Sequence, residues 1–207
     1  MTILSRVIAG FAMLVLVGCA GGDTRPDASI EEVSRAAYVH NGPPALTLFT
    51  MINNRTGAGA HTSLMVNASQ RVIYDPAGTV RMSFVPERGD VLYGINPAVA
   101  DFYASAHARE TFHVVIQRIE VSPAVAEQAL RLAIARGSVA SAQCAISTSG
   151  ILRQLPGFEG VTSTWFPNRL MESFETIPGV QTRKLFEDDA DDKSIAVAQF
   201  ERAVQGQ

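Results

Sequence analysis

The chain has 207 residues, of which 47% are hydrophobic and 18% are charged, and its formal net charge is -3. This length predicts one folded domain, and the hydrophobic share excludes a largely disordered chain. The slightly acidic balance argues against a nucleic-acid-binding protein, because such proteins concentrate Lys and Arg on one face.

The N-terminus has the pattern of a signal peptide. Arg6 precedes an unbroken apolar run over residues 7–17, which is too short to cross a bilayer of about 30 Å as a permanent helix. The run ends in Leu16-Val17-Gly18-Cys19, which resembles the lipobox of bacterial lipoproteins. This resemblance implies cleavage before Cys19 and lipid attachment to its thiol. The alternative is an ordinary secretory signal that is cut a few residues later.

These motifs predict a signal peptide at residues 1–18, a lipidated N-terminus and tether at 19–29, and a single domain at 30–207. Two or more acyl chains anchor a protein stably, so the membrane is the expected partner at this end, without a spanning helix. Ala20 rather than Asp follows Cys19, and by resemblance to Gram-negative lipoproteins this favours the periplasmic face of the outer membrane.

Hydrophobic periodicity and turn residues predict the secondary structure. Strands are expected at 45–52, 61–66, 71–74, 89–95 and 111–121, and helices at 29–38, 97–106, 123–136, 142–154, 168–174 and 194–204. The second and third strands form a hairpin, and Ser122 and Ser141 are expected to cap the helices that follow them. This order of elements predicts an α+β domain with a small antiparallel sheet packed by helices.

Cys144 is a candidate nucleophile, because lipidation of Cys19 leaves it as the only free thiol. It falls in the first turn of the helix expected at 142–154, where the helix dipole and unpaired N–H groups stabilise a thiolate. A nearby imidazole lowers the thiol pKa further, and the same N–H groups can bind the oxyanion of an acyl-transfer intermediate. The alternative is that Cys144 is a small buried hydrophobic residue.

His61 is the candidate base, since it begins the first strand of the hairpin. If residues whose numbers sum to about 137 face each other in that hairpin, Asp75 lies beside His61 and can orient the imidazole. A slip of one residue would present Tyr74 instead. His113 is the alternative base if the hairpin is wrong.

Two stretches carry a resemblance to a known group of families. They are Ala60-His61-Thr62-Ser63-Leu64-Met65-Val66 and Val72-Ile73-Tyr74-Asp75. They resemble the histidine hairpin of the circularly permuted papain-like families, which are relatives of the NlpC/P60 hydrolases and of lecithin:retinol acyltransferase. In these families the histidine precedes the cysteine. The resemblance extends over roughly residues 44–155, through a strand and a helix to Gln143-Cys144-Ala145.

The resemblance implies a permuted papain-like fold and a thiol hydrolase or acyltransferase. Cys144 would attack an amide, ester or thioester carbonyl, His61 would act first as general base and then as acid, and Asp75 would orient His61. At the cell envelope the expected substrates are cell-wall peptide amides or lipid acyl groups. The competing interpretation is a non-enzymatic envelope lipoprotein that keeps this fold for binding or scaffolding.

No metal or other cofactor is expected, because no pair of His or acidic residues has the spacing of a zinc site. The acidic run at 187–192 lacks the glycine and the alternating spacing of an EF-hand loop. It predicts a solvated linker or the start of a helix. We expect the protein to be a monomer that binds no nucleic acid.

Overall fold

The computed structural model describes residues 26–78 and 80–206. The predicted signal peptide, Cys19 and most of the tether lie outside the described residues. The strands are β1 (Ala45–Asn53), β2 (Gly59–Asn67), β3 (Arg71–Tyr74), β4 (Glu87–Arg88), β5 (Val91–Leu92), β6 (Phe112–Glu120) and β7 (Gln181–Leu185). The helices are α1 (Ile30–Ala36), α2 (Pro97–His107), α3 (Pro123–Arg136), α4 (Cys144–Leu152), α5 (Pro167–Glu175) and α6 (Lys193–Gln205).

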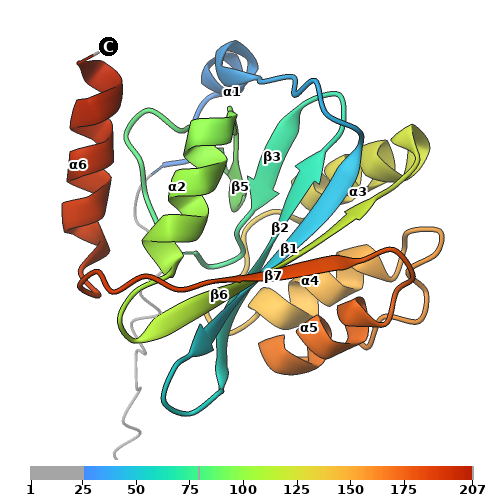
Figure 1. Ribbon diagram of the computed structural model, residues 1–207. Coiled ribbons are helices and arrows are strands. Elements are labelled where there is room, and N and C mark those ends of the chain that lie inside the picture. The colour runs from blue at the N-terminus through green and yellow to red at the C-terminus, as the bar shows by residue number, and fades with distance from the viewer. Residues whose placement is uncertain (1–25, 79, 207) are drawn as a thin grey trace, which may run out of the picture.

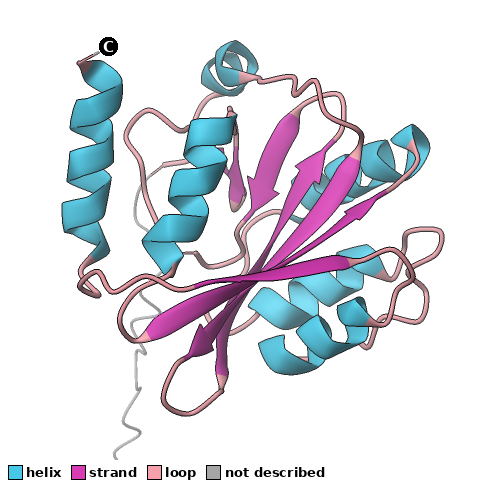
Figure 2. Cartoon of the chain, viewed as in Figure 1, coloured by secondary structure: helices cyan, strands magenta, loops and turns pink. Residues whose placement is uncertain are grey.

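Within the described ranges, seven strands form one antiparallel sheet in the order β4-β5-β3-β2-β1-β6-β7 (Figure 1). Six helices pack around this sheet (Figure 2). The predicted α+β class is therefore confirmed. The sheet is larger than the small one expected, because two of its strands were not predicted as separate elements.

Both faces of the sheet are covered. Figure 1 shows α2 and α6 on one side and α3, α4 and α5 on the other. Side chains of β1 alternate between two apolar cores, with Leu46 and Leu48 in the core under α3, α4 and α5, and with Phe49 and Met51 in the core under α2. Because both of its faces are buried, β1 has a nearly continuous apolar sequence instead of an alternating one.

The strand expected at 89–95 is much shorter in the structure, where β5 covers only Val91–Leu92. Gly89 and Asp90 both have positive φ angles, of 60° and 59°, and form a two-residue turn between β4 and β5. A two-residue turn of this kind has both central residues in the left-handed region, and here it joins β4 to β5 in a short hairpin. The sequence also gave no prediction for β7, which is an exposed, largely polar edge strand.

The N-cap of α3 agrees with the prediction, whereas the N-cap of α4 does not. The Ser122 hydroxyl accepts a hydrogen bond from the backbone N–H of Val125 at 3.3 Å. Ser141 does not cap α4, because the chain turns through a positive φ of 65° at Ala142 and the helix begins at Cys144. Cys144 is thus the first residue of its helix.

The register of the hairpin differs by one residue from the expected one. Leu64 pairs with Tyr74, so facing residues sum to 138, and the β2–β3 ladder ends at this pair. Side chains alternate along a strand, so Tyr74 points to the α4 side, where its hydroxyl lies 2.6 Å from Ser147 Oγ. Asp75 follows on the other face, which it shares with His61. Tyr74 is therefore excluded as the residue that orients His61.

Among the described residues, none of the helices has both the length and the apolar character needed to cross a membrane.

Candidate active site

The first turn of α4 lies beside β2 at the point where β3 has ended. The ladder between β2 and β3 stops at Leu64, so the residues of β2 that precede Leu64 are not paired with β3 on that side. Cys144 occupies this position with 6% of its surface exposed. The His61 ring and the backbone N–H groups of Thr62 and Ala145 act on its sulfur through hydrogen-bonding interactions that lower the pKa of the thiol. The short β3 therefore makes room for the thiol next to the histidine.

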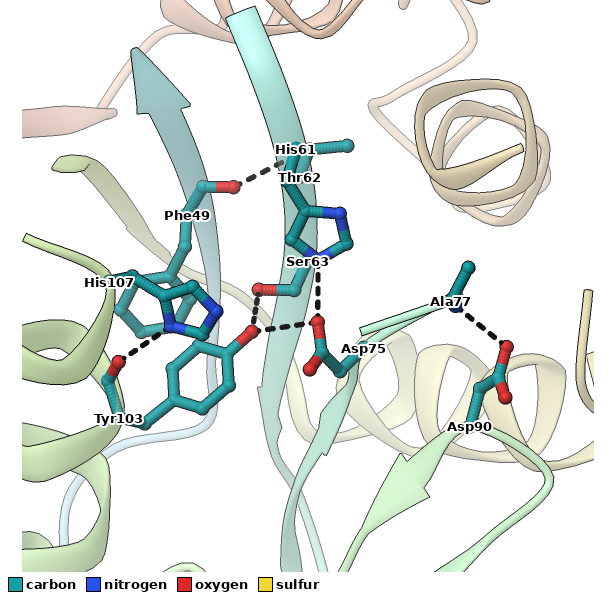
Figure 3. Close-up of polar contacts among 9 residues, drawn as sticks. All are labelled: Phe49, His61, Thr62, Ser63, Asp75, Ala77, Asp90, Tyr103 and His107. Atoms are coloured by element: carbon teal, nitrogen blue, oxygen red, sulfur yellow. Dashed lines mark hydrogen bonds and ion pairs between the residues drawn. The ribbon is translucent and has the colours of Figure 1, made fainter. Parts of the chain in front are cut away.

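The His61 imidazole bridges the thiol and a buried carboxylate. Its Nε2 lies 2.6 Å from Asp75 Oδ1 (Figure 3). The His61 side chain is 19% exposed, whereas Asp75 is fully buried. Because Nε2 is held by Asp75, Nδ1 is the ring nitrogen left to exchange a proton with Cys144. The structure thus brings together the three residues that were predicted to form the site.

The electrostatics of Asp75 and His61 favour a charged pair. Burial acts to raise the pKa of Asp75, but the charge and hydrogen bond of His61 outweigh it and lower that pKa to about 2. Burial likewise acts to lower the pKa of His61, but the charge and hydrogen bond of Asp75, with a smaller contribution from Cys144, raise it to about 9. The imidazole is therefore protonated at neutral pH.

The thiol is shifted towards its ionised form. Burial acts to raise the pKa of Cys144, yet the hydrogen bond and positive charge of His61 and the N–H groups of Thr62 and Ala145 hold it below its ordinary value. The first backbone N–H groups of α4 have no partner within the helix. They are thus available to stabilise negative charge on sulfur, or on the oxygen of a carbonyl under attack.

Tyr103 is a second hydrogen-bond partner of Asp75 Oδ1 and was not predicted from the sequence. Its hydroxyl donates to Asp75 Oδ1 at 2.9 Å and lies 2.7 Å from Ser63 Oγ (Figure 3). Burial raises the pKa of Tyr103 well above its ordinary value, so this hydroxyl keeps its proton and remains a donor. Tyr103 is therefore a positioning residue that holds the carboxylate against His61.

Asp90 joins the two loops that flank the thiol. Its Oδ2 accepts hydrogen bonds from the backbone N–H of Ala77 at 2.9 Å and from that of Val139 at 3.0 Å. Ala77 follows Asp75, and Val139 belongs to the segment that leads into α4. One carboxylate thus fixes the spacing between the strand end that carries Asp75 and the helix that carries Cys144.

A cavity of about 230 Å³ opens beside the thiol. Cys144, His61, His107, Lys193, Ala142 and Phe112 contribute to its walls. A second cavity of about 380 Å³ lies between α2 and the strands β6 and β7. It shares no lining residue with the first cavity and does not reach the thiol, so the smaller cavity is the candidate substrate site.

Comparison with models of protein families, with curated proteins and with solved structures finds no match.

Other residues considered from the sequence lie outside the cavity wall. The Nδ1 of His113 is 2.7 Å from Asn54 Oδ1 and its ring stacks on Phe186, so His113 does not serve as the base. The acidic run contributes the N-cap of α6, where Asp192 accepts from the N–H of Ser194. Among the described residues, no group of three or more His, Cys, Asp or Glu side chains is arranged to hold a metal ion.

Gly78→Ala is expected to disturb the His61–Asp75 pair. A Cβ atom built on Gly78 would overlap the Asp75 carboxylate, which is buried and held in place by His61 and Tyr103. We expect a loss of about 1–3 kcal/mol in unfolding free energy, as for other overpacked sites, together with slower alkylation of Cys144 at pH 7. Thermal unfolding and iodoacetamide kinetics measure the two effects.

Gly160→Ala is the matched control, because a Cβ atom at Gly160 meets no heavy atom within 4 Å. Equal thermal stability and equal alkylation rates in the two variants would contradict the prediction.

Proposed function

We propose that this chain is a thiol hydrolase or acyltransferase with a circularly permuted papain-like domain. One observation carries the proposal: His61 is hydrogen-bonded to the buried Asp75 at 2.6 Å, lowers the pKa of Cys144 and lines one cavity together with that thiol. A structural cysteine would not need two N–H groups and a protonated imidazole beside its sulfur, nor a buried carboxylate that holds this imidazole. The order of the residues, with histidine before cysteine, supports the permuted arrangement.

The geometry supports a two-step acyl transfer. The Cys144 thiolate attacks a carbonyl carbon, a sulfur–carbon bond forms, and the N–H groups at the start of α4 receive the resulting oxyanion. His61 then protonates the leaving group, which departs and leaves a thioester. Water or another acceptor attacks the thioester while His61 removes its proton, and the thiolate departs. Asp75 holds His61 in the required orientation throughout.

The proposal includes a location at the cell envelope. The sequence before the described domain supports a lipid anchor on Cys19, which would place the cavity close to cell-wall peptide amides and to the acyl groups of lipids. Metabolic labelling with an alkyne analogue of palmitate in a Gram-negative host is expected to mark the wild-type chain but not Cys19→Ala. Equal labelling of the two would overturn the anchor and would leave the proposed chemistry in place.

An activity assay on the full-length chain in detergent tests the chemistry. Aryl amides and aryl esters of N-acetylated amino acids serve as probes. The wild-type chain is expected to release the chromophore and to form an acyl-enzyme at Cys144 that mass spectrometry detects. Cys144→Ala should lose both signals, whereas His113→Ala should keep them. A wild-type chain that forms no acyl-enzyme with any probe would support the scaffolding interpretation.

A further inference from the structure

The cavity wall includes a second histidine whose Nε2 has no hydrogen-bond partner among the described residues. His107 is 3% exposed, and it lines the cavity together with Cys144 and His61. Its Nε2 is buried and makes no hydrogen bond within residues 26–78 and 80–206. The His61 and His107 rings are 6.2 Å apart between centroids, with their planes inclined by 21°. Both rings therefore lie close together in the wall of the cavity beside the thiol.

The hydrogen bond at the other nitrogen fixes the tautomer of His107. Its Nδ1 lies 2.8 Å from the backbone carbonyl oxygen of Tyr103, one turn earlier in α2 (Figure 3). A carbonyl oxygen can only accept, so Nδ1 carries the proton. In the neutral ring Nε2 is then a pure acceptor. An unpaired buried acceptor costs free energy unless a donor reaches it.

The surroundings keep this ring neutral. Burial, followed by the positive charge of Lys193, lowers the pKa of His107 to about 3. A ring with so low a pKa is a poor base at neutral pH, so a role in proton transfer is disfavoured. What remains for Nε2 is to accept a hydrogen bond from a bound molecule.

We propose that His107 Nε2 receives the N–H of an amide substrate bound at Cys144. This inference rests on the proposed function and narrows it: the site selects secondary amides over esters and over tertiary amides, which have no N–H hydrogen. A site built to accept a hydrogen bond discriminates strongly against an analogue that lacks the donor, because the buried acceptor is then left unpaired. His107 thus sets specificity without taking part in proton transfer.

The test uses two alkylating probes that differ only at nitrogen. They are the chloroacetamide of butylamine and its N-methylated analogue. In both, the Cys144 sulfur displaces chloride: a sulfur–carbon bond forms and the carbon–chlorine bond breaks. Rates are measured on the full-length chain by mass spectrometry of the Cys144 peptide and are divided by the rates with glutathione, which removes the difference in intrinsic reactivity.

The normalised rate ratio of the N–H probe to the N-methyl probe is expected to be about tenfold in the wild-type chain. It should fall to within about twofold in His107→Leu and recover in part in His107→Gln, whose side-chain oxygen can take the place of Nε2. His113→Leu is the matched control, since this histidine is also bonded through Nδ1 but lies outside the cavity wall, and it should keep the wild-type ratio.

A wild-type ratio near one, or an unchanged ratio in His107→Leu, would overturn the inference and leave the proposed function intact. Failure of both probes to label Cys144 faster than glutathione reacts would instead overturn the proposed function. Nitrogen-15 NMR of the wild-type chain tests the inference even if His107→Leu does not fold. The His107 Nε2 resonance should be that of an unprotonated nitrogen, and it should shift after labelling with the N–H probe only. A protonated Nε2 in the unlabelled chain would also overturn the inference.

Discussion

His61→Ala is expected to raise the pH midpoint of Cys144 alkylation above that of an ordinary thiol, about 8.5. In the wild-type chain the hydrogen bond and charge of His61 are the main factors that lower the pKa of Cys144. Without them, burial remains as the largest effect, and burial raises the pKa. The wild-type midpoint should lie below the ordinary value. Rates of iodoacetamide modification between pH 4 and pH 10 at Cys144 measure both midpoints.

The same substitution should reduce acyl transfer at pH 7 by about 10³-fold or more, since the reaction loses both its base and its acid. His113→Ala provides the control, because it removes an imidazole that is bonded to Asn54 and lies away from the thiol. If the alkylation midpoints of wild type and His61→Ala coincide, His61 does not activate the thiol and the assignment of the base fails.

Asp75→Asn is expected to destabilise the fold by about 3–5 kcal/mol, the usual consequence of removing one partner from a buried ion pair. The effect should depend on pH in a direction that the two pKa shifts determine. His61 has a raised pKa in the folded chain, so the folded state binds its proton more tightly than the unfolded state does. Its contribution is therefore complete below about pH 6.5 and is lost as the pH rises through about 9.

Asp75 behaves in the opposite way. Its pKa is lowered to about 2, so its contribution is present above about pH 4 and is lost as the pH falls through about 2. The pair thus predicts highest stability between roughly pH 4 and pH 6.5. Between pH 6.5 and pH 9 the free energy of unfolding should fall by up to about 3 kcal/mol. This is the energy equivalent of raising the pKa of His61 from 6.5 to about 9.

Thermal unfolding between pH 4 and pH 10 measures this dependence. The Cys144→Ala background is preferable, because it removes the titration of the thiol from the same range. In that background Asp75→Asn should flatten the profile between pH 6.5 and pH 9, whereas Asp101→Asn, at an exposed position of α2, should leave it unchanged. A profile that is equally steep with and without Asp75 would show that the carboxylate does not hold His61 in its charged form.

Cys144, His61 and Asp75 could be predicted as site residues from the sequence, because local sequence patterns indicate the helix and strands on which they lie. The helix that starts near Cys144 and the strand that starts near His61 are both visible in hydrophobic periodicity and turn residues. Asp75 was found because it stands directly after the second strand of the hairpin. Register is less well determined by sequence, and the observed pairing of Leu64 with Tyr74 is shifted by one residue from the expected one.

The residues that surround these three could not be found in the same way. Tyr103 and His107 lie on α2. Their roles depend on which face of that helix packs against the sheet and on the position of Asp75 after β3. A histidine in the last turn of a helix is ordinarily stabilised as a cation, whereas burial keeps His107 neutral. Such tertiary placement leaves no periodic signal in the sequence.

The position of Lys193 in the cavity wall has a consequence for synthesis of the protein. Lys193 is the first residue of α6, the last helix of the chain, whereas His61 and Cys144 are made much earlier. Because chains are made from the N-terminus onward, His61 and Cys144 are synthesised before the residue that closes this side of the cavity. A chain that stops before α6 would therefore keep both groups and lack Lys193 from the cavity wall beside them.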